Sequence, residues 1–121
     1  IERGINPNKI FIGGFSQGAA LSLIYSQYKK YKLGGIIMLS GWMLDINSIH
    51  ILKNLNINIP IFIGHGTNDN IVLYENIMYL DNILRKNKFT NITFNTYNNM
   101  GHNCSNKEIY DIIDWINYLI K

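Results

Sequence analysis

The sequence predicts an α/β fold in which a mainly parallel sheet carries helices on both faces. Short, continuously apolar runs recur along the chain, and such runs are typical of strands buried on both faces of a parallel sheet. Longer segments of helical period separate them, which gives the order β-α-β-(α)-β-α-β-α. The composition of the 121 residues, 47% hydrophobic and 16% charged, is that of a single globular domain and argues against disorder.

Turn residues and apolar patterns set the expected bounds of these elements. The expected strands are 9–14, 35–39, 60–64 and 91–97, and the expected helices are about 17–30, about 73–87 and a last one that starts at the capping box 105–108. Residues 42–55 are the least regular segment, a loop with one short helix at most. The alternation of polar and apolar residues in 91–97 predicts a half-exposed strand near an edge of the sheet.

Each helix has an apolar stripe that we expect to face the sheet. The stripes are Leu21, Ile24 and Tyr28 in the first helix, Leu73, Ile77, Leu80 and Leu84 in the second, and Ile109, Ile112, Ile113, Ile116 and Leu119 in the last. The small residues Gly18, Ala19 and Ala20 should allow the start of the first helix to pack closely against the sheet.

Charge and cysteine content narrow the classes of partner and compartment. The formal charge of +3 is mild, and the densest basic run, 29–32, falls where a helix is expected to end, so we expect no nucleic-acid partner. The single Cys104 fits a reducing compartment, and no apolar stretch approaches the roughly 18 residues of a membrane span, which predicts a cytoplasmic protein. Because Ile1 is not an initiator methionine, the chain looks like a piece of something longer. The sequence leaves open whether the protein forms a homo-oligomer.

The stretch Gly13–Ala19 has the pattern G-x-S-x-G, with Ser16 at its centre. An apolar strand precedes it and a helix follows, which is the context of the nucleophile elbow of α/β hydrolases. That turn holds the serine in a strained conformation, so we expect Gly14 and Gly18 to be needed because larger residues would collide. The context makes Ser16 a much better candidate for a nucleophile than for a simple loop or cap residue.

Three polar residues follow three expected strands, where open α/β sheets place their functional groups. Ser16 follows the first strand, Asp69 the third and His102 the fourth. The chain order Ser, Asp, His is that of α/β hydrolases. His102 would accept the serine proton, and Asp69 would hold the imidazole in the required tautomer.

Each of these residues also has a simpler interpretation. Asp69 could cap the following helix, and His102 could be a histidine of a surface loop. We expect His65, four residues before Asp69, to be structural and to fix that loop by hydrogen bonds. Cys104 lies two residues after His102, but no second Cys or His pair nearby completes a set of metal ligands.

Four motifs occur in the order and spacing of one known family. They are Gly14-Phe15-Ser16-Gln17-Gly18, Leu39-Ser40-Gly41-Trp42, Gly64-His65-Gly66-Thr67-Asn68-Asp69 and Tyr97-Asn98-Asn99-Met100-Gly101-His102. With them the chain resembles the C-terminal half of the acyl-protein thioesterase/lysophospholipase/carboxylesterase family of small α/β hydrolases. Thr67 departs from the family, which frequently has an acidic residue there.

The resemblance implies a partial α/β-hydrolase fold and a set of roles. It implies that Ser16, Asp69 and His102 form the catalytic triad, and that the backbone N–H of Gln17 contributes to the oxyanion hole. It implies that Trp42, Met43 and Leu44 lie near an acyl pocket, and that esters or thioesters, on lipidated proteins or lysophospholipids, are cleaved without cofactor or metal. It also implies that residues 1–121 form one domain, whose first strands and second oxyanion donor would precede Ile1.

Three hypotheses of function follow. The first is a serine hydrolase that cleaves carboxylic esters or thioesters through an acyl-enzyme on Ser16. The second is a non-catalytic, hydrolase-like domain that pairs with a missing segment or a partner, because the strand 9–14 would have an unpaired edge. The third, weaker hypothesis is a hydrolase of peptidase or dienelactone type.

Overall fold

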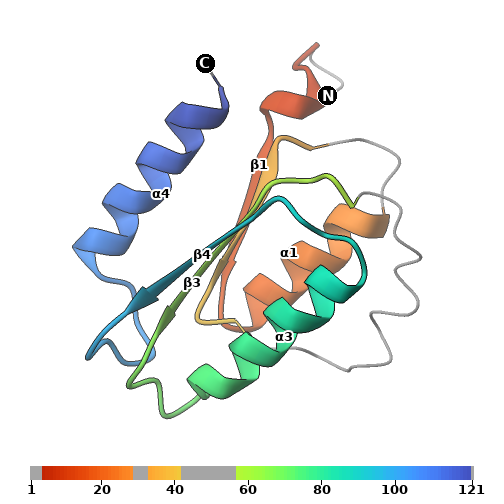
Figure 1. The fold of residues 1–121 in the computed structure, drawn as a ribbon. Helices are drawn as coiled ribbons and strands as arrows, with labels where there is room; N and C mark the ends of the chain where they lie inside the picture. The colour runs from red at the N-terminus through yellow and green to blue at the C-terminus, as the bar shows by residue number, and fades with distance from the viewer. Residues whose placement is uncertain (1–3, 29–32, 42–56, 121) are drawn as a thin grey trace.

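The fold is a four-stranded parallel sheet with helices on both faces, as the sequence predicts (Figure 1). The computed structural model describes residues 4–28, 33–41 and 57–120. The strands are β1 (Phe11–Phe15), β2 (Gly35–Leu39), β3 (Ile61–Gly66) and β4 (Ile92–Tyr97), and their order in the sheet is their order in the chain. The helices are η1 (Pro7–Lys9), α1 (Gln17–Tyr28), α3 (Tyr74–Lys86) and α4 (Asn106–Leu119). No helix among the described residues is long and apolar enough to cross a membrane.

The sheet separates two layers of helices. Helices α1 and α3 cover one face, and α4 lies on the other (Figure 1). Every residue of β3 is buried, because β2 and β4 flank it and both faces are covered, whereas all of β4 except Tyr97 is at least partly exposed. The half-exposed edge strand predicted from the alternation in 91–97 is therefore confirmed.

Alternate residues of the strands pack against the two layers. On the side of α1 and α3, the core includes Ala19, Leu23, Ile36, Met38, Ile61, Ile63, Ile77, Leu80 and Leu84. On the other side, Trp115 of α4 packs against Phe62 and Phe11, with ring centroids 5.6 and 5.8 Å apart. Trp115 therefore joins α4 to both β1 and β3.

The predicted inward stripe of α1 is wrong. Leu21 is 53% exposed and Ile24 is partly exposed, and the side chain of Tyr28 lies outside the described residues. The polar residues Ser22 and Ser26 are buried instead, because their hydroxyls donate to carbonyls of the same helix. Such local bonds satisfy the hydroxyls, so a face that looks polar in the sequence can be buried.

The stripes of the other two helices are confirmed in part. In α3, Ile77, Leu80 and Leu84 are buried, but Leu73 is the N-cap residue and is half exposed. In α4, Ile109 and Ile113 remain 45% and 47% exposed. The exposure of Leu73, Ile109 and Ile113 has one cause. The period of a helix predicts which side of the helix is apolar, but not how much of that side the sheet covers.

The capping box at the start of α4 is only half formed. Ser105 Oγ accepts a hydrogen bond from the Glu108 backbone N–H, as predicted. The Glu108 side chain turns inward, is fully buried, and has no hydrogen-bond partner for either oxygen among the described residues. It lies against Gly64, where an added Cβ would collide with the carboxylate. Burial raises the pKa of Glu108, because the charged form loses its hydration.

We predict that the substitution Glu108→Gln stabilises the fold more at neutral than at acidic pH. The raised pKa means that Glu108 favours the folded state below its unfolded pKa and loses this contribution as the pH rises through the folded pKa. Glutamine keeps the shape and does not titrate. We would measure the free energy of unfolding by urea at about pH 4 and about pH 8. The value for the variant minus the value for the wild type should increase with pH. A difference independent of pH would contradict the buried, titrating carboxyl.

Candidate active site

Ser16 occupies the turn between β1 and α1 in a conformation that is unusual for a serine. Its φ angle is 59°, in the left-handed region, at an expected cost of about 1–3 kcal/mol. The surrounding backbone holds it there: Ser16 N–H donates to the Leu39 carbonyl at 2.8 Å, and Ala19 N–H donates to the Ser16 carbonyl at 3.0 Å. The strand, sharp turn and helix predicted from the sequence are therefore confirmed.

The two glycines of the turn have different roles. A Cβ at Gly14 would collide with the backbone of Gly18 and Ala19, so the close approach of β1 to the start of α1 requires a glycine there. A Cβ at Gly18 would meet no atom of the described residues within 4 Å. The expectation that both positions must be small is right for Gly14 and wrong for Gly18. Gly18 takes part in the close approach through its backbone, which a Cβ at Gly14 would meet.

Asp69 follows β3 and has a buried carboxylate that is fully hydrogen-bonded. Its Oδ1 accepts from the N–H groups of Ile71 and Val72 at 2.9 and 2.8 Å. Its Oδ2 lies 2.8 Å from Nδ1 of His102. Burial alone would raise the pKa of Asp69, but the hydrogen bonds from His102 and the two backbone N–H groups outweigh burial and hold the pKa below its ordinary value. Asp69 is therefore a carboxylate oriented from two sides.

His102 joins this carboxylate to the serine. Nδ1 donates to Asp69, which leaves Nε2 as an acceptor at 3.1 Å from Ser16 Oγ. The ring packs against Phe15, whose centroid is 4.8 Å away. The structure thus brings Ser16, Asp69 and His102 from three strand ends into one chain of hydrogen bonds. This arrangement can move a proton from the serine hydroxyl to the imidazole.

The loops that carry Asp69 and His102 are tied to each other by hydrogen bonds. Asn68 N–H donates to the Met100 carbonyl at 2.9 Å, and Asn99 N–H donates to Thr67 Oγ1 at 3.0 Å. Gly66 lies so close to Met100 that a Cβ would collide with its carbonyl. Sequence reasoning missed that Thr67 holds the two loops together, because no motif pairs Thr67 with Asn99, 32 positions away.

His65 holds the loop that carries Asp69 by a hydrogen bond, and it is not part of the hydrogen-bonded chain from Asp69 through His102 to Ser16. The side chain is fully buried, and Nε2–H donates to the Val72 carbonyl at 2.7 Å, which confirms the predicted structural role. Burial lowers the pKa of His65, although Val72 and Asp69 act in the opposite direction. A neutral ring with its proton on Nε2 fits both the carbonyl and the Asp69 Oδ2 atom 3.5 Å away.

The remaining predicted site residues fall into two groups. Gln17 is the first residue of α1, so its backbone N–H is among those that a helix leaves without an intrahelical partner. Trp42, Met43 and Leu44 lie outside the described residues. Ser40 appears in one of the four motifs, but sequence reasoning missed its role. It is buried with φ 47°, and its hydroxyl donates to the Asn103 carbonyl at 3.4 Å, which ties the end of β2 to the loop of His102.

Comparison with known proteins finds relatives over the whole chain. A family model described as Phospholipase/Carboxylesterase matches residues 1–120. Acyl-protein thioesterase 1 of Debaryomyces hansenii is 38% identical over 118 residues, with 97% of this chain and 51% of that protein covered. Acyl-protein thioesterase 1 of Yarrowia lipolytica is 37% identical over 122 residues, with 99% of this chain and 54% of that protein covered.

Solved structures agree with these matches. The crystal structure of Arabidopsis thaliana SOBER1 superposes with a TM-score of 0.90 at 36% identity, covering 99% of this chain and 57% of that one. The chain therefore spans about half the length of the curated relatives it matches.

The two glycines of the turn provide a test of its geometry. We predict that Gly14→Ala destabilises the fold by about 1–3 kcal/mol or more, because backbone atoms must move to admit the methyl group. Gly18→Ala should instead stabilise α1 by up to about 1 kcal/mol, since alanine is the better helix former. Urea unfolding of the two variants measures the difference. Equal destabilisation by both would contradict the asymmetric contact.

Proposed function

The chain belongs to the phospholipase/carboxylesterase family, and from this we propose that it carries the triad of a serine hydrolase that cleaves carboxylic esters or thioesters. The observation that supports the proposal most strongly is the hydrogen-bonded chain from Asp69 through His102 to Ser16. The order of these residues in the sequence and the strained turn at Ser16 support it as well. The curated relatives are thioesterases and the family model describes phospholipases and carboxylesterases, so these matches do not favour the non-catalytic alternative.

The proposed reaction begins with acyl transfer to the enzyme. Ser16 Oγ attacks the acyl carbonyl carbon while His102 Nε2 takes the hydroxyl proton. Asp69 stabilises the imidazolium that forms. When the tetrahedral intermediate collapses, the bond to the leaving sulfur or oxygen breaks, and His102 returns the proton to that atom. A water molecule, activated by His102 in the same way, then hydrolyses the acyl-Ser16 ester and frees the fatty acid.

The negative charge of the tetrahedral intermediate needs N–H donors. In the proposal, the backbone N–H of Gln17 supplies one, since the start of α1 also provides the positive end of the helix dipole. A second donor would come from the part of the family fold outside this chain. Loss of one such donor typically costs about 10²–10³ in rate. Full activity would therefore require the complete family fold. In the same proposal, Trp42, Met43 and Leu44 lie near the acyl group.

The substrate class is proposed from the names of the relatives. Two of them are called acyl-protein thioesterase 1, which points to thioesters on proteins as substrates for this family member. Lysophospholipids and simple esters are the other substrates that the same chemistry would allow, because the triad contacts only the acyl carbonyl and the leaving atom.

We predict that a fluorophosphonate probe labels the natural polypeptide that carries this chain, and that Ser16→Ala abolishes the labelling. The reason is that Ser16 alone has a hydroxyl within hydrogen-bonding distance of His102 Nε2 among the described residues. Ser22→Ala is the matched control, since Ser22 Oγ donates to the Gly18 carbonyl and its loss should leave labelling intact. Gel fluorescence measures both. Labelling that persists in Ser16→Ala would overturn the proposed function.

A further inference from the structure

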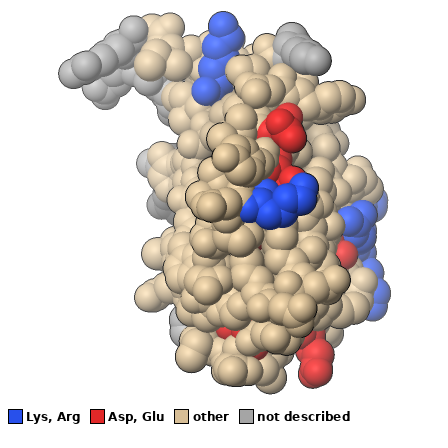
Figure 2. All heavy atoms as spheres, turned by 90° about the vertical axis from the view of Figure 1, so that its left-hand side faces the viewer, with Lys and Arg blue, Asp and Glu red and all other residues tan. Residues whose placement is uncertain are grey.

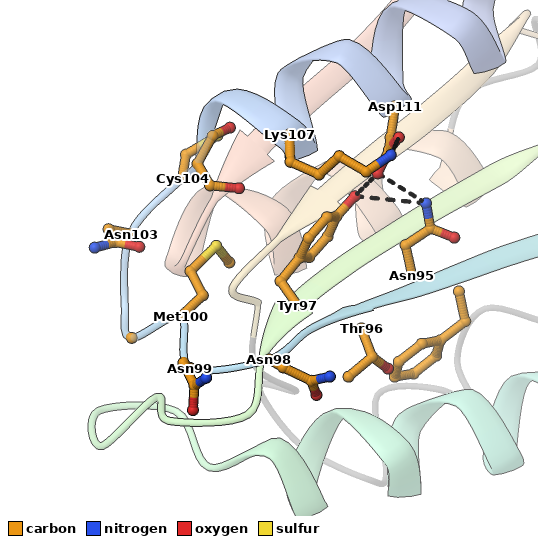
Figure 3. A pocket seen from close by; sticks show the side chains of 13 residues that line it. Asn95, Thr96, Tyr97, Asn98, Asn99, Met100, Asn103, Cys104, Lys107 and Asp111 are labelled. Carbon is orange, nitrogen blue, oxygen red and sulfur yellow. Dashed lines mark hydrogen bonds and ion pairs between the residues drawn. The ribbon is translucent and has the colours of Figure 1, made fainter.

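A groove of about 940 Å³ lies between β4 and the start of α4 (Figure 3). One wall contains four consecutive residues of β4, Phe94–Tyr97, and the other contains Lys107 and Asp111 of α4. The loop that carries His102 closes one end, with Gly101 and Asn103 among the lining residues. A groove over one face of a strand would be lined by alternate residues. Four consecutive strand residues indicate a groove along the edge of the strand.

The backbone of β4 faces this groove with hydrogen-bonding groups. β4 is an outer strand among the described residues. The Asn91 and Tyr97 carbonyls accept from Ile61 and Thr67 N–H, on the side of β3. In a parallel pair, residues of the same parity point their N–H and C=O groups to the same neighbour. Phe94 and Thr96 have the opposite parity, so their N–H and C=O groups point away from β3 to the open edge.

One end of the groove adjoins the loop that carries His102. His102 returns its proton to the departing atom, so that atom must lie within hydrogen-bonding distance of Nε2 during the reaction. Gly101 and Asn103, the sequence neighbours of His102, line the groove. In the thioester of an acylated protein, the leaving group is the cysteine of a polypeptide. In the inference, this polypeptide passes over the loop that carries His102 and reaches the open edge of β4 on the other side of that loop.

The lining of the groove is about equally polar and apolar, and it has little net charge. Asn95, Asn98 and Asn103 contribute amides to its lining, and Lys107 Nζ lies 2.7 Å from Asp111 Oδ1, so that the two charges neutralise each other. The face of the molecule that carries α4 shows only small, separate groups of charged atoms (Figure 2). Such a lining suits backbone amides and uncharged polar side chains better than a charged ligand.

We propose that this groove binds an extended segment of the acyl-protein substrate next to its acylated cysteine, as an added strand on the edge of β4. The inference rests on the proposed function. Backbone N–H and C=O groups of the segment pair with those of Phe94 and Thr96, while the asparagine amides contact its side chains. Recognition through the backbone predicts that many sequences are accepted, provided that the segment is extended and has free N–H groups.

The test uses the natural polypeptide that carries this chain as the enzyme. It compares the cleavage of two thioesters with the same acyl group, one on the cysteine of a ten-residue peptide and one on N-acetylcysteamine. Thr96→Pro removes the N–H that faces the groove, and proline is tolerated where an edge N–H faces outward. The ratio of kcat/KM, peptide over small thioester, should fall about three- to tenfold, the effect of one lost hydrogen bond. Thr90→Pro, at an exposed position before β4 and outside the groove, is the control and should keep the ratio.

A second measurement avoids any change to the protein. N-methylation of alternate peptide bonds in the acylated peptide removes the N–H groups on one edge of the segment. Because more than one hydrogen bond is then lost, the wild-type protein should cleave that peptide more slowly by at least the factor expected for Thr96→Pro with the unmodified peptide. An unchanged ratio in both experiments would overturn the inference. A second result would also overturn it. If sedimentation shows that the wild type is a dimer and Thr96→Pro a monomer, while the ratio of kcat/KM is unchanged, the edge of β4 pairs with a second copy of this chain and not with the substrate. If wild-type protein cleaves neither thioester, the proposed function fails, and the inference fails with it.

Discussion

The hydrogen bond between Asp69 Oδ2 and His102 Nδ1 is the contact on which the site depends. It joins residues that are 33 positions apart and come from loops after two different strands. Asp69 can hold His102 because its other oxygen is fixed by two backbone N–H groups, and because buried His65 fixes the carbonyl at the end of the same loop. With Nδ1 committed to the carboxylate, Nε2 faces Ser16 as an acceptor. One contact therefore sets both the direction and the tautomer of the ring.

The parallel sheet is what allows this contact to form. Parallel strands present their carboxyl ends at one edge, so the loops after β1, β2, β3 and β4 meet there although they are far apart in sequence. Hydrogen bonds then tie these loops together: Ser16 to Leu39, Ser40 to Asn103 and Asn68 to Met100. The positive φ angles of Ser16, Ser40 and Asn99 occur at this same edge. The strain of these turns is opposed by the packing of the buried strands behind them.

Much of this arrangement could be predicted from the sequence, for identifiable reasons. Buried parallel strands have an unmistakable apolar pattern, and the position of a residue just after a strand predicts its place at the functional edge, which is how Ser16, Asp69 and His102 could be found. Distant contacts that no motif or strand end indicates could not be predicted, such as Thr67 with Asn99 or Glu108 against Gly64. The buried faces of the helices could be predicted only in part. In α1, Ser22 and Ser26 are buried because their hydroxyls donate to carbonyls of the same helix, while Leu21 is exposed. The expected acyl-pocket residues Trp42, Met43 and Leu44 lie outside the described residues.

Proton NMR in water tests the central contact most directly. A proton held between an imidazole nitrogen and a carboxylate is strongly deshielded and protected from exchange, so the Nδ1 proton of His102 should give a resonance far downfield of the backbone amides. His102→Gln assigns the signal and separates it from that of buried His65. The signal should persist in Ser16→Ala and vanish in Asp69→Ala, because it depends on the carboxylate and not on the serine. A His102 signal that survives Asp69→Ala, or that is missing from the wild type, would contradict the account.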